Sequence, residues 1–423
     1  MSSVASASLR NEVRVTPGVL FRLSAAASAV AVGLVVVSAV LELRTTHWGI
    51  ALVALPLLVA NLVLARLAYP ALERRAGIAL VSLLAAIALG GVVAWSGDAS
   101  WAVALHVAGA AVAFALGAVV VVGAFRGEAT PLAAGRDYLT LTKPRIMTLL
   151  LLTGAAGMFV GAQGVPPLGL FVVTMLGLAL ACGGASALNH VLDRDIDVLM
   201  GSRTKERPVA SGRVTPEQAL EFGIVLSAVS FALLASAVNV LTAVLALVGN
   251  LFYVLVYTVW LKPRTAQNIV IGGAAGAFPP LIGWVAATGR VEALPLLLFA
   301  IIFLWTPPHF WALSLFVRSD YAAAGIPMLP VVAGLDNTRR RVFLYSLPMA
   351  GAAIAPWPLG LAGPIYGVSA AILSFVFVVL AGRVLTNRTT EPSAMAAEKH
   401  LFAYSIFYLF ALFTALVADR WIA

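Results

Sequence analysis

The chain has little of what stabilises secreted and soluble proteins. It contains one cysteine, Cys182, inside an apolar run, which excludes a disulfide framework and a cysteine-rich metal site. Charged residues make up only 11% of the 423 positions, whereas about a quarter of a typical soluble domain is charged. A soluble globular protein is therefore excluded. The N-terminus shows no signal-peptide pattern with a small-residue processing site, so we expect its first apolar segment to remain as a span.

Apolar runs are what the sequence has in abundance. Runs of about 18 to 25 apolar residues recur along the whole chain, and each is long enough to cross a hydrocarbon layer of about 30 Å. The pattern predicts an all-α polytopic membrane protein surrounded by the lipid bilayer. The expected spans lie near 18–41, 47–69, 77–96, 101–125, 146–162, 168–188, 217–236, 239–258, 269–288, 292–316, 343–361, 366–384 and 400–418.

The loops between these spans alternate in charge. Most Lys and Arg residues fall in loops 66–75, 126–145, 189–216, 259–268, 317–342 and 383–399, while the opposite loops are short and nearly uncharged. By the positive-inside rule, the N-terminus and the charged loops lie in the cytoplasm and the C-terminus lies outside. We therefore predict a multi-pass protein of the cell (inner or plasma) membrane. The net charge of +9 then needs no nucleic-acid partner.

One linker divides the chain. Residues 127–135 contain Gly127, Thr130, Pro131 and Gly135, which are typical of a connection between domains. We predict a four-span segment over residues 1–130 and a nine-span domain over residues 131–423.

An acidic stripe follows the second span of the larger domain. Asn189, Asp193 and Asp197 are spaced four residues apart, so on a helix their oxygen atoms share one face. The alternative interpretation is that these three residues lie at the solvent-exposed end of a helix and have no role in a site. Charges at membrane depth, however, cost roughly 2.5–3.5 kcal/mol each at a helix centre and tend to pair or to bind ions. Mg²⁺ prefers such oxygen ligands, above all where phosphate oxygens complete its shell.

Basic and aromatic residues on the same predicted face extend this hypothesis. The basic residues are Lys143, Arg145, Arg203, Arg207, Lys262 and Arg264. They are either orientation signals or ligands for a diphosphate. The segment Trp305–Trp311 contains two prolines and His309, and prolines are tolerated where a helix lines a cavity. Asp320 and Tyr321 follow in the next charged loop.

These motifs carry a resemblance to a known family. They are Asn189 to Gly212, Leu141 to Arg145, Tyr257-Thr with Lys262, Gln267 to Gly273, Leu304 to Leu313, Asp320-Tyr321 and Ala324 to Pro330. In this order they resemble the intramembrane aromatic prenyltransferases of the UbiA superfamily, and within it the branch that farnesylates heme. The resemblance covers about residues 135 to 420.

The resemblance implies a fold and a reaction. It implies a nine-helix bundle around a central cavity, preceded here by about four extra helices. The implied reaction transfers farnesyl from farnesyl diphosphate to a vinyl group of heme b, with Mg²⁺ as cofactor, and gives heme O. The implied metal ligands are Asn189, Asp193, Asp197 and Asp320, with Asp193, Asp197 and Lys262 as catalytic residues. The implied substrate-binding residues are Lys143, Arg145, Arg203, Arg207, Tyr257, Arg264, His309 and Tyr321.

The sequence departs from the superfamily in two places, and its four-span N-terminal segment lies outside the resemblance. Most members have a second aspartate pair, where this chain keeps only Asp320, and His190 replaces an acid beside Asn189. In the four-span segment, the stretch from Trp101 to Ala110, with His106, resembles a heme-bearing helix of heme A synthase. That likeness implies a remnant of such a domain and heme A synthase as a partner. The other interpretation is a scaffolding or fused partner segment.

Three other functions stay open from the sequence. A prenyltransferase acting on a quinone precursor or another aromatic acceptor would share the acidic stripe. A transporter would show paired broken helices in internal repeats. A heme-binding assembly factor would need no stripe of aspartates.

Overall fold

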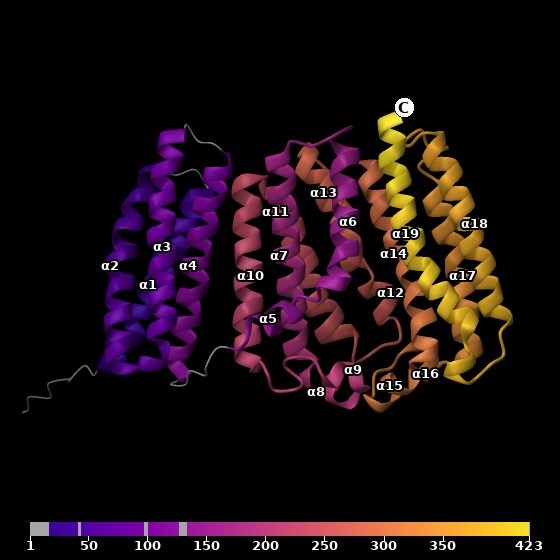
Figure 1. Cartoon of the computed structure of the whole chain (residues 1–423), viewed down its shortest axis with the longest axis horizontal. Coiled ribbons are helices and arrows are strands. Elements are labelled where there is room, and N and C mark those ends of the chain that lie inside the picture. Colours follow the sequence, from indigo (N-terminus) through magenta and orange to yellow (C-terminus); the bar gives the residue numbers. More distant parts are fainter. Residues whose placement is uncertain (1–16, 41–43, 97–99, 127–132, 423) are drawn as a thin grey trace, which may run out of the picture.

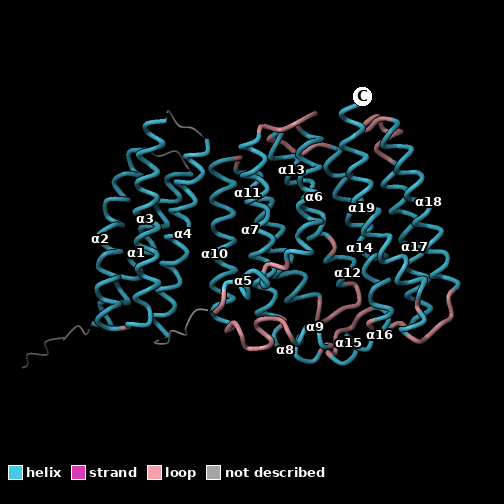
Figure 2. Tube along the Cα trace, in the orientation of Figure 1, coloured by secondary structure: helices cyan, strands magenta, loops and turns pink. Residues whose placement is uncertain are grey.

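The chain folds into long helices that lie roughly side by side (Figures 1 and 2). The computed structural model describes residues 17–40, 44–96, 100–126 and 133–422, and contains no strand within them. Four helices form a bundle at one side: α1 (Pro17–Val40), α2 (Arg44–Ala68), α3 (Pro70–Ser96) and α4 (Ser100–Arg126). Small side chains such as Ala54, Ala86 and Ala110 fill much of its core, which lets the helix backbones approach closely.

The remaining chain forms the larger body. Its long segments are α6 (Pro144–Gly161), α7 (Leu168–Leu192), α10 (Pro216–Ala237), α11 (Val240–Leu251) continued by η1 (Phe252–Leu261), α12 (Asn268–Gly272) with α13 (Ala274–Thr288), α14 (Ala293–Phe316), α17 (Leu335–Ile354), α18 (Pro364–Thr386) and α19 (Ala396–Ile422). Short helices connect them: α5 (Gly135–Leu141), α8 (Arg194–Leu199), α9 (Ser202–Lys205), α15 (Arg318–Ala323), α16 (Leu329–Val332) and η2 (Pro392–Ala394).

These elements confirm an all-α polytopic membrane protein. Among the described residues, ten helices are long and apolar enough to cross a membrane, and shorter apolar stretches lie in α1 and α4. The expected span at 343–361 differs from the structure, because α17 begins at Leu335 and ends at Ile354. Its first turns contain Asp336 and three arginines, so one end of α17 is polar.

Glycine allows a close contact between helices α6 and α13 of the body. Gly157 of α6 faces the carbonyl of Pro280 in α13, and Gly154 faces the carbonyl of Pro279. A side chain at Gly157 would overlap that backbone. In lipid, where burial of apolar surface does not drive helices together, such close backbone packing is a main source of association.

The four-helix bundle packs against α10 of the body. Val107 and Ala111 of α4 share an apolar cluster with Val229 and Ala232 of α10. At another position, the Arg75 guanidinium lies 3.4 Å from the Glu221 carboxylate. Among the described residues, the two regions therefore meet through an apolar patch and an ion pair.

The short connecting helices gather at one end of the molecule. Figure 1 shows α5, α8, α9, α15 and α16 at the lower end, while the C-terminal end of α19 lies at the opposite end. Most loops predicted to be positively charged thus meet at a single end of the body.

Candidate active site

Three polar side chains of the acidic stripe are buried at the end of α7. Asn189, Asp193 and Asp197 are only 2%, 2% and 1% exposed. Asp193 ends α7 and precedes α8, and the Asp197 amide still donates to the Asp193 carbonyl at 2.8 Å. Because the helical path continues through Asp193, the four-residue spacing places all three side chains on one face.

Basic side chains from three distant segments reach this stripe. Lys262 Nζ lies 2.5 Å from Asp193 Oδ2. Arg207 donates to Asp197 Oδ1 at 2.6 Å, and Lys143 donates to Asn189 Oδ1 at 2.7 Å. The Asn189 amide in turn donates to Asp193 Oδ2 at 2.8 Å. Three cations thus surround two carboxylates, so the cluster has a surplus of positive charge.

Each carboxylate keeps one oxygen atom unused. Asp193 Oδ1 and Asp197 Oδ2 are buried and have no hydrogen-bond partner among the described residues. A buried, unpaired carboxylate oxygen is costly, and a divalent cation is a natural partner for two such atoms. The donor set therefore fits Mg²⁺, with Asp193 and Asp197 as the residues that would hold it.

The backbone at Lys143 is fixed in an uncommon conformation. Lys143 has φ 51° and ψ 59°, in the left-handed region, directly before Pro144. A non-glycine residue there costs about 1–2 kcal/mol, and Pro144 disfavours the right-handed α conformation for the residue before it. Lys143 in this conformation directly precedes α6. From there its side chain reaches Asn189.

A π-helical turn places the next group of residues. The Lys262 amide donates to the Tyr257 carbonyl at 2.9 Å, which is a five-residue spacing. The Thr258 hydroxyl accepts from the Asn189 amide at 3.2 Å. The rings of Tyr253 and Tyr257 stack with centroids 5.5 Å apart. Segments of π-helix occur frequently at functional sites, and this one brings Thr258 and Lys262 to the stripe.

The loop after α14 covers a neighbouring part of the cluster. Tyr321 and Tyr257 pack against the apolar group of Ile269, Ile326 and Met328. Only a glycine fits beside the Tyr257 ring at position 272, because any side chain there would overlap it.

Asp320 lies at a separate place. Its carboxylate is beside Gly201, where an added Cβ atom would stand 2.7 Å from Asp320 Oδ2. Within the described part of the chain, no three Asp, Glu, His or Cys residues lie close enough together to hold one metal ion. Asp320 is therefore not grouped with Asp193 and Asp197 in this structure, and its role as a metal ligand stays a prediction.

Two other predicted residues, Arg264 and Arg145, are not brought into the cluster. Arg264 is exposed and donates to the carbonyls of Val259 and Trp260, both at 3.2 Å, at the end of η1. The structure thus makes Arg264 a helix-capping residue, because unpaired carbonyls at a helix C-terminus attract cations. Arg145 is exposed on the first turn of α6, and the side chain of Arg203 lies outside the described part of the structure.

His309 belongs to a different group. Its Nδ1 lies 2.6 Å from the Ser405 hydroxyl, and its ring stacks on Trp305 and Phe402 at centroid distances of 4.2 and 4.9 Å. This aromatic group joins α14 to α19.

Burial and crowding shift the pKa values of groups at the end of the bundle. Burial and, as a smaller contribution, the nearby Arg207 guanidinium lower the pKa of Lys143 to about 7. Burial raises the pKa of Asp197, although Arg207 opposes that shift. Burial likewise raises the pKa of Tyr321 to about 12. A lysine held at this pKa among other cations favours the arrival of an anion.

The cluster contains residues that the sequence hypothesis did not include. Thr258 and Tyr253 belong to it through Asn189 and Tyr257. His190 is 1% exposed, and neither ring nitrogen has a partner among the described residues. The sequence contained a signal for Thr258, because it lies within the Tyr257-Thr motif. The π-helical turn that joins these residues has no recognisable sequence pattern.

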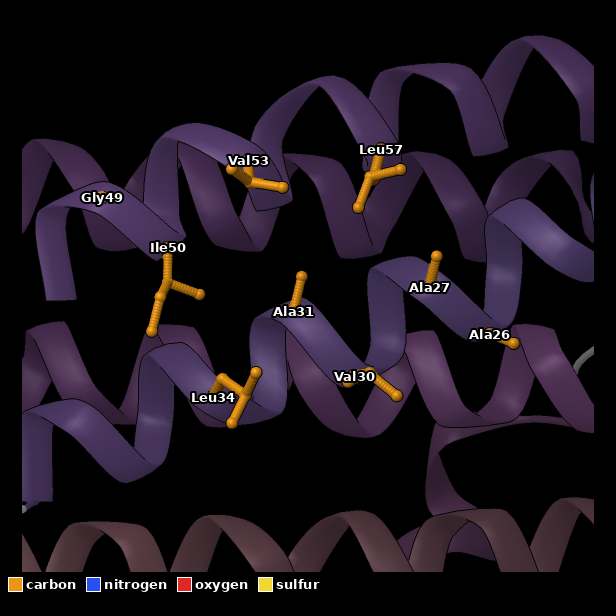
Figure 3. A pocket seen from close by; sticks show the side chains of 9 residues that line it. All are labelled: Ala26, Ala27, Val30, Ala31, Leu34, Gly49, Ile50, Val53 and Leu57. Atoms are coloured by element: carbon orange, nitrogen blue, oxygen red, sulfur yellow. The ribbon is translucent and has the colours of Figure 1, made fainter. Parts of the chain in front are cut away.

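An apolar groove of ≈ 570 Å³ lies elsewhere, between α1 and α2 (Figure 3). Its lining includes Val30, Leu34, Val53 and Leu57. Its lining residues are aliphatic apart from one glycine, Gly49, and the groove is open rather than enclosed. Side chains of this kind on membrane-spanning helices are typical of a lipid-facing surface. The groove has no polar group that would fix a reacting ligand.

The fold is shared with solved membrane proteins. A structure of digeranylgeranylglyceryl phosphate synthase matches with a TM-score of 0.58 at 16% identity, covering 68% of this chain and 99% of that one. A UbiA homolog from Archaeoglobus fulgidus, bound to GPP and Mg²⁺, matches with a TM-score of 0.51 at 17% identity over 66% of this chain and 99% of its own. The larger body of the chain therefore has the same helical-bundle fold as these proteins.

Sequence relatives identify the family. The model of the UbiA prenyltransferase family matches residues 150–416. The protoheme IX farnesyltransferase of Rhizorhabdus wittichii is 53% identical over 294 residues, which are 70% of this chain and 97% of that protein. That of Symbiobacterium thermophilum is 51% identical over 67% of this chain and 94% of its own. The chain belongs to the UbiA prenyltransferase family and, within it, to the group of the protoheme IX farnesyltransferases.

Proposed function

We propose that the protein transfers the farnesyl group of farnesyl diphosphate to a vinyl group of heme b and so makes heme O. The observation that carries the site is the pair of unused carboxylate oxygens, Asp193 Oδ1 and Asp197 Oδ2, enclosed by three cations. The acceptor and donor follow from the relatives, which are named as protoheme IX farnesyltransferases.

The diphosphate is proposed to bind at the cluster. Its negative charge matches the surplus of Lys143, Arg207 and Lys262 over the two aspartates. Mg²⁺ held by Asp193 and Asp197, with Asn189 beside them, would neutralise charge on the diphosphate as it leaves. Arg203 and Asp320 extend this proposal as a further cation and as the ligand of a second ion.

The chain's own residues act on the leaving group. The bond between farnesyl C1 and the diphosphate oxygen breaks, and the diphosphate departs with both bonding electrons. The outer vinyl carbon forms the new bond to C1, water adds its hydroxyl to the inner vinyl carbon, and one proton is released. Positive groups already in place at Lys262 and Arg207 stabilise the charge that develops on the diphosphate.

Aromatic side chains are proposed to protect the cationic farnesyl group. The stacked rings of Tyr253 and Tyr257 lie on η1, the element that ends at Lys262. The faces of aromatic rings stabilise a nearby cation and offer no nucleophile stronger than a phenol. Tyr321 packs beside Tyr257 and extends this wall.

The heme is proposed to lie toward α14 and α19. His309 is held at Nδ1 by Ser405, and its Nε2 makes no hydrogen bond to any described residue. Ring stacking with Trp305 and Phe402 fixes its plane. A histidine oriented in this way fits contact with a flat macrocycle or its iron.

Two further statements belong to this proposal. The protein lies in the cell membrane. The end that carries α8, α9 and α15 faces the cytoplasm, because the positively charged loops gather there. Residues 1–130 form a separate membrane domain and residues 131–423 form the prenyltransferase. Heme A synthase, which acts on heme O, is the proposed partner of the complete protein.

Incubation of membranes containing the protein with heme b, farnesyl diphosphate and Mg²⁺ tests the proposed reaction. Mass spectrometry should detect a heme that has gained one farnesyl group and one hydroxyl group. Chelation by EDTA should remove the product, and added Mg²⁺ should restore it. A parallel incubation supplies a quinone precursor as acceptor. Prenylation of that acceptor with no modified heme would contradict the proposal.

A further inference from the structure

His190 lies at the active-site end of α7 with no hydrogen-bond partner. Its side chain is 1% exposed, and neither ring nitrogen bonds to a described residue. An imidazole carries at least one N–H group in either of its protonation states. A buried donor without a partner is costly, so such a group usually has a ligand or a function. None of the contacts within the cluster satisfies this donor.

The helix places His190 beside the acidic stripe. The Asp193 amide donates to the Asn189 carbonyl and the Asp197 amide donates to the Asp193 carbonyl, both at 2.8 Å, so the helical path is unbroken here. On such a path, residues three and seven positions apart share a face. His190 precedes Asp193 by three positions and Asp197 by seven. Its ring therefore projects on the side of the helix where both carboxylates lie.

Two cations flank His190. Lys143 donates to Asn189 Oδ1 at 2.7 Å, and Arg207 donates to Asp197 Oδ1 at 2.6 Å. Lys143 and Arg207 are also the charged groups that act most strongly on the His190 ring. Lysine and arginine side chains have donors only, so neither can accept a hydrogen bond from His190. The ring thus adds one more donor to the part of the cluster where the cations lie.

The two carboxylates do not accept from His190. Asp193 Oδ1 and Asp197 Oδ2 have no partner among the described residues, and the second oxygen of each acid accepts from amide, lysine or arginine groups. In the described ranges, His190 is also not grouped with these two acids as a third metal ligand. The acceptor for its N–H must then arrive with a ligand. Among these cations, that ligand is an anion with several oxygen atoms.

We propose that His190 donates a hydrogen bond to an oxygen of the diphosphate of the prenyl donor. This inference rests on the proposed function, which places the diphosphate among Lys143, Arg207 and Lys262. A donor already in place at the leaving group stabilises the negative charge that develops there. An acid at position 190 would instead add a third negative charge beside the phosphate oxygens. Histidine therefore supplies a donor without reducing the surplus of positive charge.

Binding of inorganic pyrophosphate with Mg²⁺ tests this role without heme and without turnover. The full chain is purified in detergent, and calorimetric titration measures the dissociation constant. His190→Leu removes both ring nitrogens at similar volume and should weaken binding by about 10- to 100-fold, because a hydrogen bond to a charged group is lost. His400→Leu is the matched control, because His400 is exposed on α19. It should bind pyrophosphate like the wild type.

A second pair of variants separates donation from shape. His190→Gln and His190→Glu introduce side chains of the same shape, and only the glutamine amide has N–H donors. His190→Gln should keep most of the affinity of the wild type, whereas His190→Glu should bind pyrophosphate about tenfold more weakly or worse. Binding by His190→Glu that is as tight as by His190→Gln would overturn the proposal, because position 190 would then not act as a donor.

Stability distinguishes a ligand-binding histidine from a packing residue. Without ligand, the unpartnered nitrogens of His190 stabilise nothing. The melting temperature of ligand-free His190→Leu should therefore equal or exceed that of the wild type, since apolar replacement of an unsatisfied buried group is neutral or stabilising. A lower melting temperature together with unchanged affinity for pyrophosphate would make His190 a packing residue and would overturn the proposal.

The same titrations separate this inference from the proposed function. If the wild type and all variants at position 190 bind pyrophosphate equally, His190 is not a ligand, while the diphosphate site remains. If the wild type itself binds no pyrophosphate in the presence of Mg²⁺, both the site and the role of His190 are wrong. If binding depends on His190 but heme b is not farnesylated, the role of His190 is supported and the acceptor alone is wrong.

Discussion

The two regions of the molecule treat buried polar groups differently. At the end of the body, cationic side chains from three distant segments surround Asp193 and Asp197, and one oxygen of each acid stays unused. In the four-helix bundle, His47 and His106 lie among alanine and aliphatic side chains. Ionised groups at membrane depth are costly, so the charged cluster needs many segments to hold it, whereas two imidazoles need only four adjacent helices.

The cores of the two regions follow the same division. The core of the body contains large buried side chains such as Trp311, Tyr366 and Phe413, while the bundle core is rich in alanine. Large aromatic residues hold helices apart and shape walls, whereas small residues bring helices together. The helices of the body are therefore packed around large side chains, whereas the helices of the bundle pack closely through small ones.

The largest effect should come from removing a cation of the body cluster. Lys262→Ala leaves Asp193 buried without its partner and removes positive charge from the diphosphate site. Loss of one electrostatic group of this kind costs about 10²–10³-fold in kcat. Lys205→Ala is the matched control, because Lys205 is exposed in α9. Steady-state formation of farnesylated heme measures both variants, and equal rates would show that Lys262 has no part in the reaction.

A smaller effect is expected from a residue that supports the cluster without carrying charge. Thr258→Val keeps the shape of the side chain and removes the hydroxyl that accepts from Asn189. A hydrogen bond of this kind contributes about 0.5–1.5 kcal/mol, so turnover should fall by up to about tenfold. Thr288→Val, at the C-terminal end of α13, provides the comparison. If Thr258→Val turns over as fast as this control, the Thr258 hydroxyl does not position Asn189 for the reaction.

The smallest effect concerns the contact between the two regions. Arg75 and Glu221 are largely buried at that contact, with side chains 10% and 19% exposed. A double-mutant cycle with Arg75→Gln and Glu221→Gln should give a coupling free energy of unfolding of about 1 kcal/mol or less. The exposed pair Arg66 and Glu73 within the bundle should give no measurable coupling. Equal couplings in the two cycles would mean that the ion pair does not hold the regions together.

Much of this arrangement was predictable because it follows from hydropathy and charge. The apolar runs predicted the long helices, most of them with ends in error by a few residues, although α17 (Leu335–Ile354) lies well before the expected span at 343–361. Loop charge predicted that the acidic stripe and the segments of Lys143 and Lys262 lie at one end. Local geometry was not predictable. The sequence of η1 looks like that of any apolar helix, so its π-helical turn had no signal, although the Tyr257-Thr motif pointed to Thr258 itself.

Two residues show where sequence reasoning about single side chains fails. Arg264 follows Lys262 by two positions, and both are basic residues at the end of the same span. In the structure Lys262 turns inward to Asp193, while Arg264 turns back to the helix carbonyls. The direction of a side chain after a helix end depends on the backbone path, which residue spacing alone does not fix.

The central claim is that the buried oxygens of the stripe, and not acidity at this membrane face in general, carry the chemistry. Asp193→Asn and Asp195→Asn test it directly, because both change one acid of the same segment to its amide. Asp193 is 2% exposed, whereas the Asp195 side chain is 87% exposed and pairs with Arg194. In an assay with heme b, farnesyl diphosphate and Mg²⁺, Asp193→Asn should reduce product formation by about 10²–10³-fold, and Asp195→Asn should match the wild type. Equal rates in the two variants would contradict the account.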